Sequence, residues 1–300
     1  QGQQIDWLGA ALLTLALSGV VLVCSLGGRE LPWDSALTWG LVAASAAATL
    51  AFIWAETRAA EPILPLSLFS LNVFSATSGI SFLQGAIMLG TLSFLPLYLQ
   101  IALGFSPTVS GFLLIPMTVG IVFASTFSGI YMGRTGRYRV LPIAGMSVIM
   151  LAGALMTQFG TQTSALYFSG ALLVFGAGLG FIFPVTTTVV QNAVPRALMG
   201  TATASGVMFR QIGGTVAVAV FGAVFAARMA GTAGLPDAAS LSPDLLSTLP
   251  LAARTAAALG VSGALNPIYW AVCALALAGL CLALILREVP LTNRMMPKGA

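Results

Sequence analysis

Charge is what this 300-residue sequence most lacks. Asp, Glu, Lys and Arg make up 7% of the residues, whereas hydrophobic residues make up 58% and the mean hydropathy is +0.99. An ordinary soluble domain is about one quarter charged, so this chain cannot cover a surface that faces water. It can cover one that faces lipid, where a spanning helix needs about 20 apolar residues. The composition therefore predicts an all-α polytopic transmembrane helical bundle.

Histidine is absent altogether, and with it the commonest proton shuttle and metal ligand. Cys24, Cys273 and Cys281 lie in apolar runs without paired spacing, which predicts neither a disulfide framework nor a metal-thiolate site. The net charge of +4 is too small and too scattered for nucleic-acid binding. We therefore expect no cofactor, no metal and no nucleic-acid partner.

The motifs of membrane enzymes are also missing. All eight acidic residues fall in connections or at the edges of apolar runs, and the sequence contains no HExxH, no GxSxG and no intramembrane pair of Asp. An intramembrane hydrolase needs a nucleophile and a base, and none can be named. We expect no enzyme and assign no catalytic residue.

Long apolar runs are what the sequence does have. Eight are long enough to cross a bilayer, and turn signals such as "LGGRELPWD" and "LGFSP" separate them. They are continuously apolar and rich in Ala, Leu and Gly, which excludes the alternation of barrel strands. The predicted spans are residues 7–26, 36–55, 72–99, 108–130, 140–158, 165–189, 200–226 and 267–286.

The basic residues between these spans predict the topology. If the N-terminus, the even-numbered connections and the C-terminus share one side, that side holds eight Lys and Arg and the other side three. Cytoplasmic loops carry the Lys/Arg excess, so both ends are expected in the cytoplasm. The one long connection, residues 227–266, then lies outside. Its stretch "SPDLLSTLPLAARTAAALG", closed by Gly260, fits one or two short surface helices, and a plain loop fits equally.

One charged residue lies deep within a span. Arg210 follows "GTATASGVMF", and even the gentler insertion scales give a cost of about 2.5–3.5 kcal/mol for an arginine at the bilayer centre. Helical spacing places it on a stripe of small residues that would let another helix approach closely, so it is expected to face the protein. It is either a structural arginine bonded to backbone carbonyls or a substrate or coupling residue, with neutral partners available in Gln84 and in the cluster Thr186–Thr188. The stripe consists of Ala202, Gly206, Arg210, Gly214 and Ala217.

Other candidates lie in the third, sixth and seventh spans. Gly176, Gly180 and Pro184 recur every four residues, which favours close helix packing that ends at a kink or break, with a flexible gating helix as the alternative. Gln84 and Gln211 are candidates to line a polar cavity, although an interhelical hydrogen bond is the plainer role for each. The glycine spacing does not match a dinucleotide fingerprint.

The stretch "GIYMGRTGRYR" resembles the cytoplasmic loop motif of the major facilitator superfamily, Gly-x-Leu-Ala-Asp-Arg-x-Gly-Arg-Lys/Arg. Gly129, Arg134, Gly136 and Arg137 match it, and Gly133 stands where the motif has its Asp. The stretches "EPILPLSLF", "LPLYLQIALGFSPTVSGFLLIP" and "RQIGGTVAVAVFG" are similar to the fourteen-span drug:proton antiporter branch. The resemblance implies two linker spans over residues 1–60 and the C-terminal six-helix half of a transporter over residues 61–300.

In such a family the implied activity is proton-driven export of hydrophobic or cationic drugs from a bacterial cytoplasm by alternating access, in the cytoplasmic membrane. The loop arginines would latch helix ends in one state, although Gly133 in place of Asp leaves a positive-inside topogenic role as the plainer reading. Because the opening "QGQQIDW" is no signal peptide and the family's first-half antiporter motif is absent, we expect a fragment that lacks the N-terminal six-helix half. The alternatives are export of a lipid, siderophore or metabolite on the same fold, or a membrane scaffold that moves nothing.

Overall fold

The elements that the structure describes are helices, apart from an isolated bridge residue at Leu31. A computed structural model describes residues 7–26, 31, 35–58, 66–229 and 250–288. Four short elements accompany the long helices: η1 (Leu66–Ser70), α4 (Leu95–Leu97), a π-helical turn η2 (Tyr98–Ala102) and η3 (Arg196–Leu198). The long helices are α1 (Trp7–Leu26), α2 (Ala36–Glu56), α3 (Asn72–Leu92), α5 (Pro107–Thr135), α6 (Val140–Met156), α7 (Ala165–Ala193), α8 (Met199–Met229) and α10 (Leu251–Ile285).

Each of the eight predicted spans overlaps one long helix, and the third also includes α4 and part of η2. In the described part of the chain, seven helical segments are long and apolar enough to cross a membrane, and the apolar helix α6 is slightly shorter. Its 17 residues reach the lower limit of about 17 residues for a spanning helix. The prediction of an all-α, multi-pass bundle with about eight spans is confirmed.

The last span begins earlier than predicted. Helix α10 runs without interruption from Leu251 to Ile285, so the stretch before residue 267 extends the spanning helix instead of forming a separate surface helix that ends at Gly260. Ala and Leu dominate "LAARTAAALGVSGAL", and both favour helix strongly enough to carry the chain through two glycines, each of which costs about 1 kcal/mol. The rest of the predicted long connection, residues 230–249, lies outside the described residues.

Two prolines differ in what they do to their helices, and the break that was one alternative at Pro184 is not found. The predicted third span is divided, because α3 ends at Leu92 and the chain resumes at α4, with Pro96 in its first turn. Pro184, in contrast, does not end α7, which continues to Ala193. A proline cannot donate to the carbonyl four residues earlier, and in α7 the hydroxyl of Ser125 on α5 donates to that carbonyl, on Gly180, over 3.1 Å.

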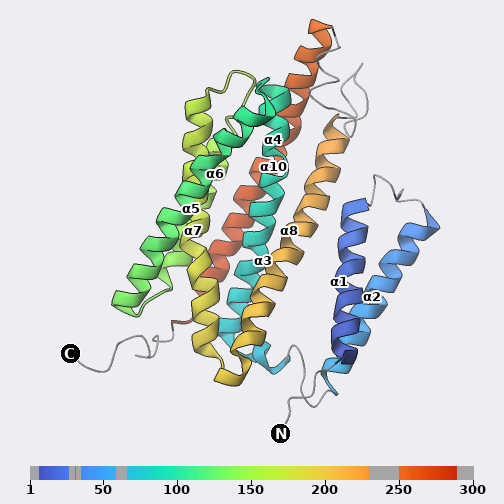
Figure 1. Ribbon diagram of the computed structural model, residues 1–300, viewed down its shortest axis with the longest axis vertical. Helices are drawn as coiled ribbons and strands as arrows, with labels where there is room; N and C mark the ends of the chain where they lie inside the picture. Colours follow the sequence, from blue (N-terminus) through green and yellow to red (C-terminus); the bar gives the residue numbers. More distant parts are fainter. Residues whose placement is uncertain (1–6, 27–30, 32–34, 59–65, 230–249, 289–300) are drawn as a thin grey trace.

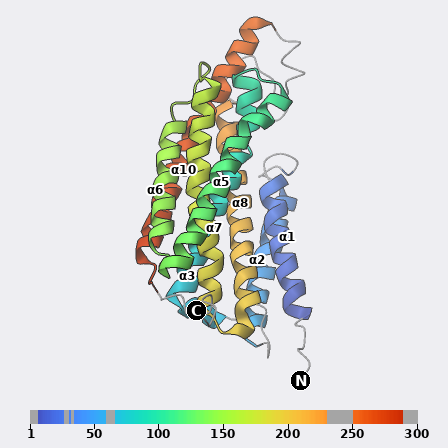
Figure 2. The same cartoon turned by 60° about the vertical axis from the view of Figure 1, so that its left-hand side comes forward.

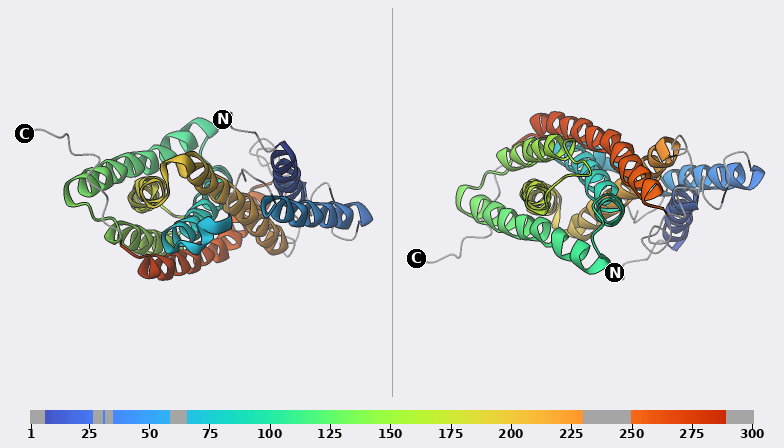
Figure 3. Two further views of the ribbon diagram at one scale, coloured as in Figure 1. Left: turned by 90° about the horizontal axis from the view of Figure 1, so that it is seen from below. Right: turned by 90° about the horizontal axis from the view of Figure 1, so that it is seen from above.

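The long helices alternate in direction along one axis, and the α1–α2 pair stands beside α8 at one edge (Figures 1 and 2). Seen along this axis, α7 lies among the other helices of the six-helix group formed by α3, α5, α6, α7, α8 and α10 (Figure 3), and it contacts α3, α5, α6 and α8. The division into a linker pair and a six-helix half remains a prediction.

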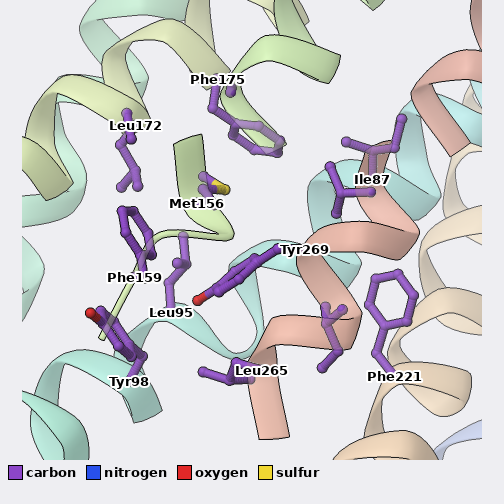
Figure 4. Packing of buried hydrophobic residues seen from close by; sticks show 14 of the residues in the cluster. Ile87, Leu95, Tyr98, Met156, Phe159, Leu172, Phe175, Phe221, Leu265 and Tyr269 are labelled. Carbon is purple, nitrogen blue, oxygen red and sulfur yellow. The ribbon is translucent and has the colours of Figure 1, made fainter. Parts of the chain in front are cut away.

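Aromatic rings fill one end of this group, away from the end where α3 begins. Tyr98 stacks on Phe159 with ring centroids 5.4 Å apart, and Tyr269 meets Phe159 edge to face at 5.6 Å (Figure 4). The Tyr98 hydroxyl donates to Gly160 O over 2.7 Å. Aromatic pairs of this kind stabilise packing beyond the area they bury, so this end of the group is held by a well-packed core.

Candidate functional site

The α3–α8 contact brings two backbones together at the level of Arg210. A Cβ at Gly85 on α3 would overlap the carbonyl of Arg210, and a Cβ at Gly213 on α8 would overlap the carbonyl of Phe82. Only glycine permits this approach. Sequence reasoning named neither glycine, because among the chain's 33 glycines no spacing singles out the two that another backbone touches.

The predicted small-residue stripe lies along the same contact. Gly214 packs against Leu89 of α3, and Gly206 lies more loosely, with Ser81 Oγ 3.9 Å from where its Cβ would be. Ala202 and Ala217 are buried. The stripe therefore faces the interior of the protein, and it carries Arg210 there.

Arg210 reaches from α8 to α7. Its Nη2 lies 3.5 Å from the Thr186 hydroxyl, and its Cζ lies 4.8 Å from the centre of the Phe183 ring. The side chain is half-buried, and its Nε, which is shielded from solvent, has no hydrogen-bond partner. A bond of 3.5 Å is long for a guanidinium, so Thr186, one of the partners that the sequence offered, satisfies only a small part of the donor capacity.

Arg210 is the twelfth of the 31 residues of α8. At 1.5 Å per residue, its Cα lies about 17 Å from the start of the helix. In the described helices every other charged residue lies at or near a helix end. The low dielectric around such a site strengthens the interaction of Arg210 with any anionic group that reaches it.

Unsatisfied polar groups also lie on α3. Gln84 is 0% exposed, and neither its amide oxygen nor its amide nitrogen has a hydrogen-bond partner. Ser81, about one turn earlier, is buried with an unpartnered hydroxyl. Gln211, the other predicted glutamine, is exposed. The structure therefore places Gln84 in the interior, on the residue next to Gly85, and leaves Gln211 outside it.

The remaining predicted glycines of the spans pack α7 against α5. A Cβ at Gly176 would overlap the carbonyl of Met117, and one at Gly180 would overlap the carbonyl of Ile121. Gly120 of α5 approaches Leu173 in the same way. These positions therefore bring two backbones into contact, and a gating role for them stays a prediction.

The predicted loop motif connects α5 to α6. Gly136 ends α5 in the left-handed conformation, with φ of +67°, and its N–H donates to Met132 O over 2.9 Å. This is the usual function of glycine after a helix C-terminus. Gly129 has no atom near its Cβ position, and Arg134 and Arg137 are exposed.

The residues that follow the motif make its contacts with the bundle. Arg139 donates to the carbonyl of Leu284, and the hydroxyl of the buried Tyr138 donates to Arg287 O over 2.8 Å. The N–H of Arg287 in turn donates to Asn72 Oδ1 over 3.0 Å. The connection thus binds the end of α10, which itself contacts the start of α3. Sequence reasoning missed Tyr138 and the acceptors on α10, because these contacts join positions almost 150 residues apart.

Donors, not metal ligands, dominate the surroundings of Arg210. In the described ranges, no group of three or more His, Cys, Asp or Glu could hold a metal ion. The guanidinium and the amide of Gln84 supply N–H groups, and the hydroxyls of Ser81 and Thr186 supply further polar atoms. Among these groups, the guanidinium of Arg210 is the one that carries a charge, and its Nε is a donor without a partner.

Residues 3–218 match the sequence profile of the Major Facilitator Superfamily. The chain is 38% identical over 296 residues to an uncharacterised MFS-type transporter of Mycobacterium tuberculosis, covering 96% of this chain and 43% of the relative. It is 31% identical over 223 residues to the multidrug transporter protein MdtP of Bacillus subtilis, covering 74% and 41%. It therefore spans less than half the length of these curated relatives. The fold resembles the fucose:proton symporter of Escherichia coli with a TM-score of 0.58 and 17% identity, covering 73% of this chain and 50% of the symporter.

Proposed function

Because the chain belongs to the Major Facilitator Superfamily, we propose that it forms part of a secondary transporter that exports small hydrophobic compounds across a bacterial cytoplasmic membrane. The observation that carries the proposal is Arg210, a half-buried charge within a spanning helix whose donors are largely unused. Charged residues inside spans are costly and mark substrate or ion pathways. The similarity to the multidrug transporter MdtP supports hydrophobic compounds as the cargo class.

Export would proceed by alternating access around a central site. Helices α3, α7 and α8 would supply this chain's side of the site, since Gln84, Thr186 and Arg210 come from these three helices. The glycine contacts between α3 and α8 and between α5 and α7 would let the group move as one body. The opposite wall would come from the six-helix half that we expect upstream.

Proton coupling requires a group that changes charge near neutral pH. The described spans offer none away from their ends, because they contain no His and no interior Asp or Glu, and Arg stays protonated. We therefore place the coupling carboxylate in the expected upstream half. The uptake of protons and the export of cargo would then involve different parts of the transporter.

Efflux measurements test this function. The protein of native length, in inverted membrane vesicles, should take up a fluorescent hydrophobic compound when a proton gradient is imposed and release it when a protonophore collapses the gradient. The 300-residue chain alone should insert in the membrane without supporting efflux. Gradient-independent accumulation by the native-length protein would reject proton-driven export, and strong efflux by the 300 residues alone would reject the need for an upstream half.

We also propose that the α5–α6 connection lies in the cytoplasm, because basic residues gather at this end of the bundle. Thr135 ends α5, and Gln162 lies in the connection between α6 and α7, at the other end of α6; both are exposed. After replacement of the three natural cysteines, Gln162→Cys should react with an impermeant maleimide in intact cells, and Thr135→Cys only after lysis. The reverse pattern would invert the topology.

A further inference from the structure

We propose that the Arg210 site takes a lipophilic anion, such as an aromatic sulfonate or carboxylate, in place of the cationic cargo that the family resemblance implies. The inference rests on the proposed function only for the idea that cargo reaches this site. It is carried by the charge and by the unused hydrogen-bond donors of the residues on α3, α7 and α8.

Charge gives the first reason. Away from the helix ends, the described spans contain one charged side chain, Arg210, and no Asp or Glu. A cation that approached the site would meet a like charge in a low-dielectric environment, where repulsion is strong. An anion would instead offset the cost of holding an arginine inside the membrane. On the surface that this chain provides, an anion is stabilised and a cation is not.

Unused donors give the second reason. The Phe183 ring lies 4.8 Å from the guanidinium carbon and accepts no conventional hydrogen bond from it, so it does not use the N–H donors of Arg210. Nη2 has only the long contact with Thr186, and Nε has no partner. Sulfonates and carboxylates accept two parallel N–H bonds from this planar fork, and such charge-assisted bonds are the strong ones. A neutral partner with one acceptor atom would leave part of the fork unpaired.

The neighbouring helix adds further donors. Gln84 and Ser81 are buried on α3 without partners. Gly85 fixes α3 against the backbone of Arg210, so these groups lie on the helix segment nearest to the arginine. An unpaired buried polar group costs free energy until it is paired. An oxyanion could use such donors, whereas a quaternary ammonium, which has no acceptor atom, could not.

Aromatic surface near the charge sets the shape of the ligand. Phe183 lies next to the guanidinium, and the helices α3, α7 and α8 that meet there are predominantly apolar in sequence. A ligand with a compact aromatic body and one anionic group would therefore match both the Phe183 ring and the arginine. A hydrophilic anion such as free phosphate would match only the charge.

A pair of probes with one ring system and opposite charge tests the proposal. Naphthalene-2-sulfonate and 2-naphthyltrimethylammonium should be titrated calorimetrically into the purified native-length protein. We expect the sulfonate to bind at least about tenfold more tightly, because a charge-assisted hydrogen-bonded pair contributes about 1.5–3 kcal/mol. Equal or tighter binding of the ammonium, or no binding of either probe, would overturn the proposal on the unmodified protein alone.

Variants assign the preference to Arg210. Arg210→Gln should weaken sulfonate binding by about tenfold and leave ammonium binding no weaker, while Arg210→Lys should retain part of the sulfonate affinity. Gln211→Ala, an exposed neighbour on the same helix, is the matched control and should bind as the parent does. Unchanged sulfonate affinity in folded Arg210→Gln would show that Arg210 is neutralised elsewhere, for instance by a carboxylate outside this chain, and would reject the anion site.

The binding and efflux measurements test the anion site and the proposed function independently. If the protein exports cations and prefers the ammonium, the proposed function is supported and the anion site is rejected. If the protein binds the sulfonate through Arg210 and shows no proton-driven efflux, the anion site is supported and the proposed function is rejected.

Discussion

Two pairs of helices pack through glycines that bring their backbones together, and the pairs differ in the hydrogen bonding of the polar atoms beside each contact. In the α5–α7 pair, Gly176 and Gly180 bring α7 against the backbone of α5. In the α3–α8 pair, Gly85 and Gly213 do the same. Beside the first contact, Ser125 donates to the carbonyl of Gly180 that Pro184 cannot use, and one hydroxyl near the start of α5, that of Ser110, has no partner. Beside the second contact, several residues carry polar atoms without partners.

The difference separates packing from binding capacity. Ser81, Gln84 and Arg210 all carry polar atoms without partners at the α3–α8 pair. Natural structures rarely leave such atoms unpaired, and each case calls for a physical reason. We infer that the α5–α7 pair serves the rigidity of the bundle, while the α3–α8 pair holds groups ready for a ligand or for a partner from outside this chain.

The largest effects should follow from substitutions that separate the backbones. Gly85→Ala and Gly176→Ala each place a methyl group on a carbonyl of the facing helix, and overpacking of this kind costs about 1–3 kcal/mol. Thermal unfolding of the purified protein should show a lowered midpoint for both. Both pairs should respond alike, because both rest on glycine.

Gly170 supplies the matched control for these substitutions. It lies on α7 with no atom near its Cβ position, so Gly170→Ala should be neutral or stabilise the helix by up to about 1 kcal/mol. If Gly176→Ala unfolds at the same temperature as Gly170→Ala, close backbone contact does not limit the stability of the α5–α7 pair.

Substitution of Arg210 should reduce transport and thereby show that the α3–α8 pair, unlike the α5–α7 pair, has a role in function. In the native-length protein, Arg210→Gln should lower the initial efflux rate by about tenfold or more, and Arg210→Lys should keep partial activity, with both at normal levels in the membrane. Arg210→Leu that expresses and transports like the parent would show that the arginine is neither a substrate nor a coupling residue. Loss of expression in every variant would assign it a structural role.

Gln84→Leu should change stability in the opposite direction. The substitution removes two buried amide atoms that have no partners, and replacing an unsatisfied polar group by an apolar one of similar size should raise the free energy of unfolding by about 1 kcal/mol. Chemical denaturation in detergent measures the change, and Gln211→Leu, at an exposed position, should have little effect. Destabilisation by Gln84→Leu would indicate that the amide is bonded in the folded protein.

The sequence predicted the helices and the buried charge better than it predicted the contacts. Lipid requires long apolar helices whatever their neighbours are, so all eight spans could be located from hydropathy. The position of Arg210 followed from the same pattern, because one charge in an apolar run is conspicuous. The early start of α10 was missed because Arg254 and several small residues lower the apolar signal there without weakening the helix.

Contacts between helices depend on rotation about each helix axis, which a span prediction does not fix. The glycine pattern at Gly176 and Gly180 was visible, whereas Gly85 and Gly213 gained their role only when α3 and α8 came together. For the same reason, the sequence did not determine the partner of Arg210. Gln84 and the Thr186–Thr188 cluster were both candidates, and in the structure Arg210 Nη2 lies 3.5 Å from the Thr186 hydroxyl.

The smallest effect should come from the α5–α6 connection, where Tyr138 and Arg139 each donate one hydrogen bond to the end of α10, while Arg139 Nε has no partner. Tyr138 and Arg139 donate to carbonyls at the end of α10, and a positive side chain at a helix C-terminus adds about 0.3–1 kcal/mol. Tyr138→Phe and Arg139→Gln should each lower the free energy of unfolding by about 0.5–1.5 kcal/mol. Hydrogen exchange should accelerate in the last turn of α10 before it does elsewhere in that helix. Arg137→Gln, at an exposed position in the same connection, removes the same charge as Arg139→Gln. It should leave exchange in α10 unchanged if the hydrogen bond of Arg139 to Leu284 O, and not its charge, stabilises the helix end. Equal acceleration by Arg137→Gln would mean that net positive charge, and not the two hydrogen bonds, stabilises this end of α10.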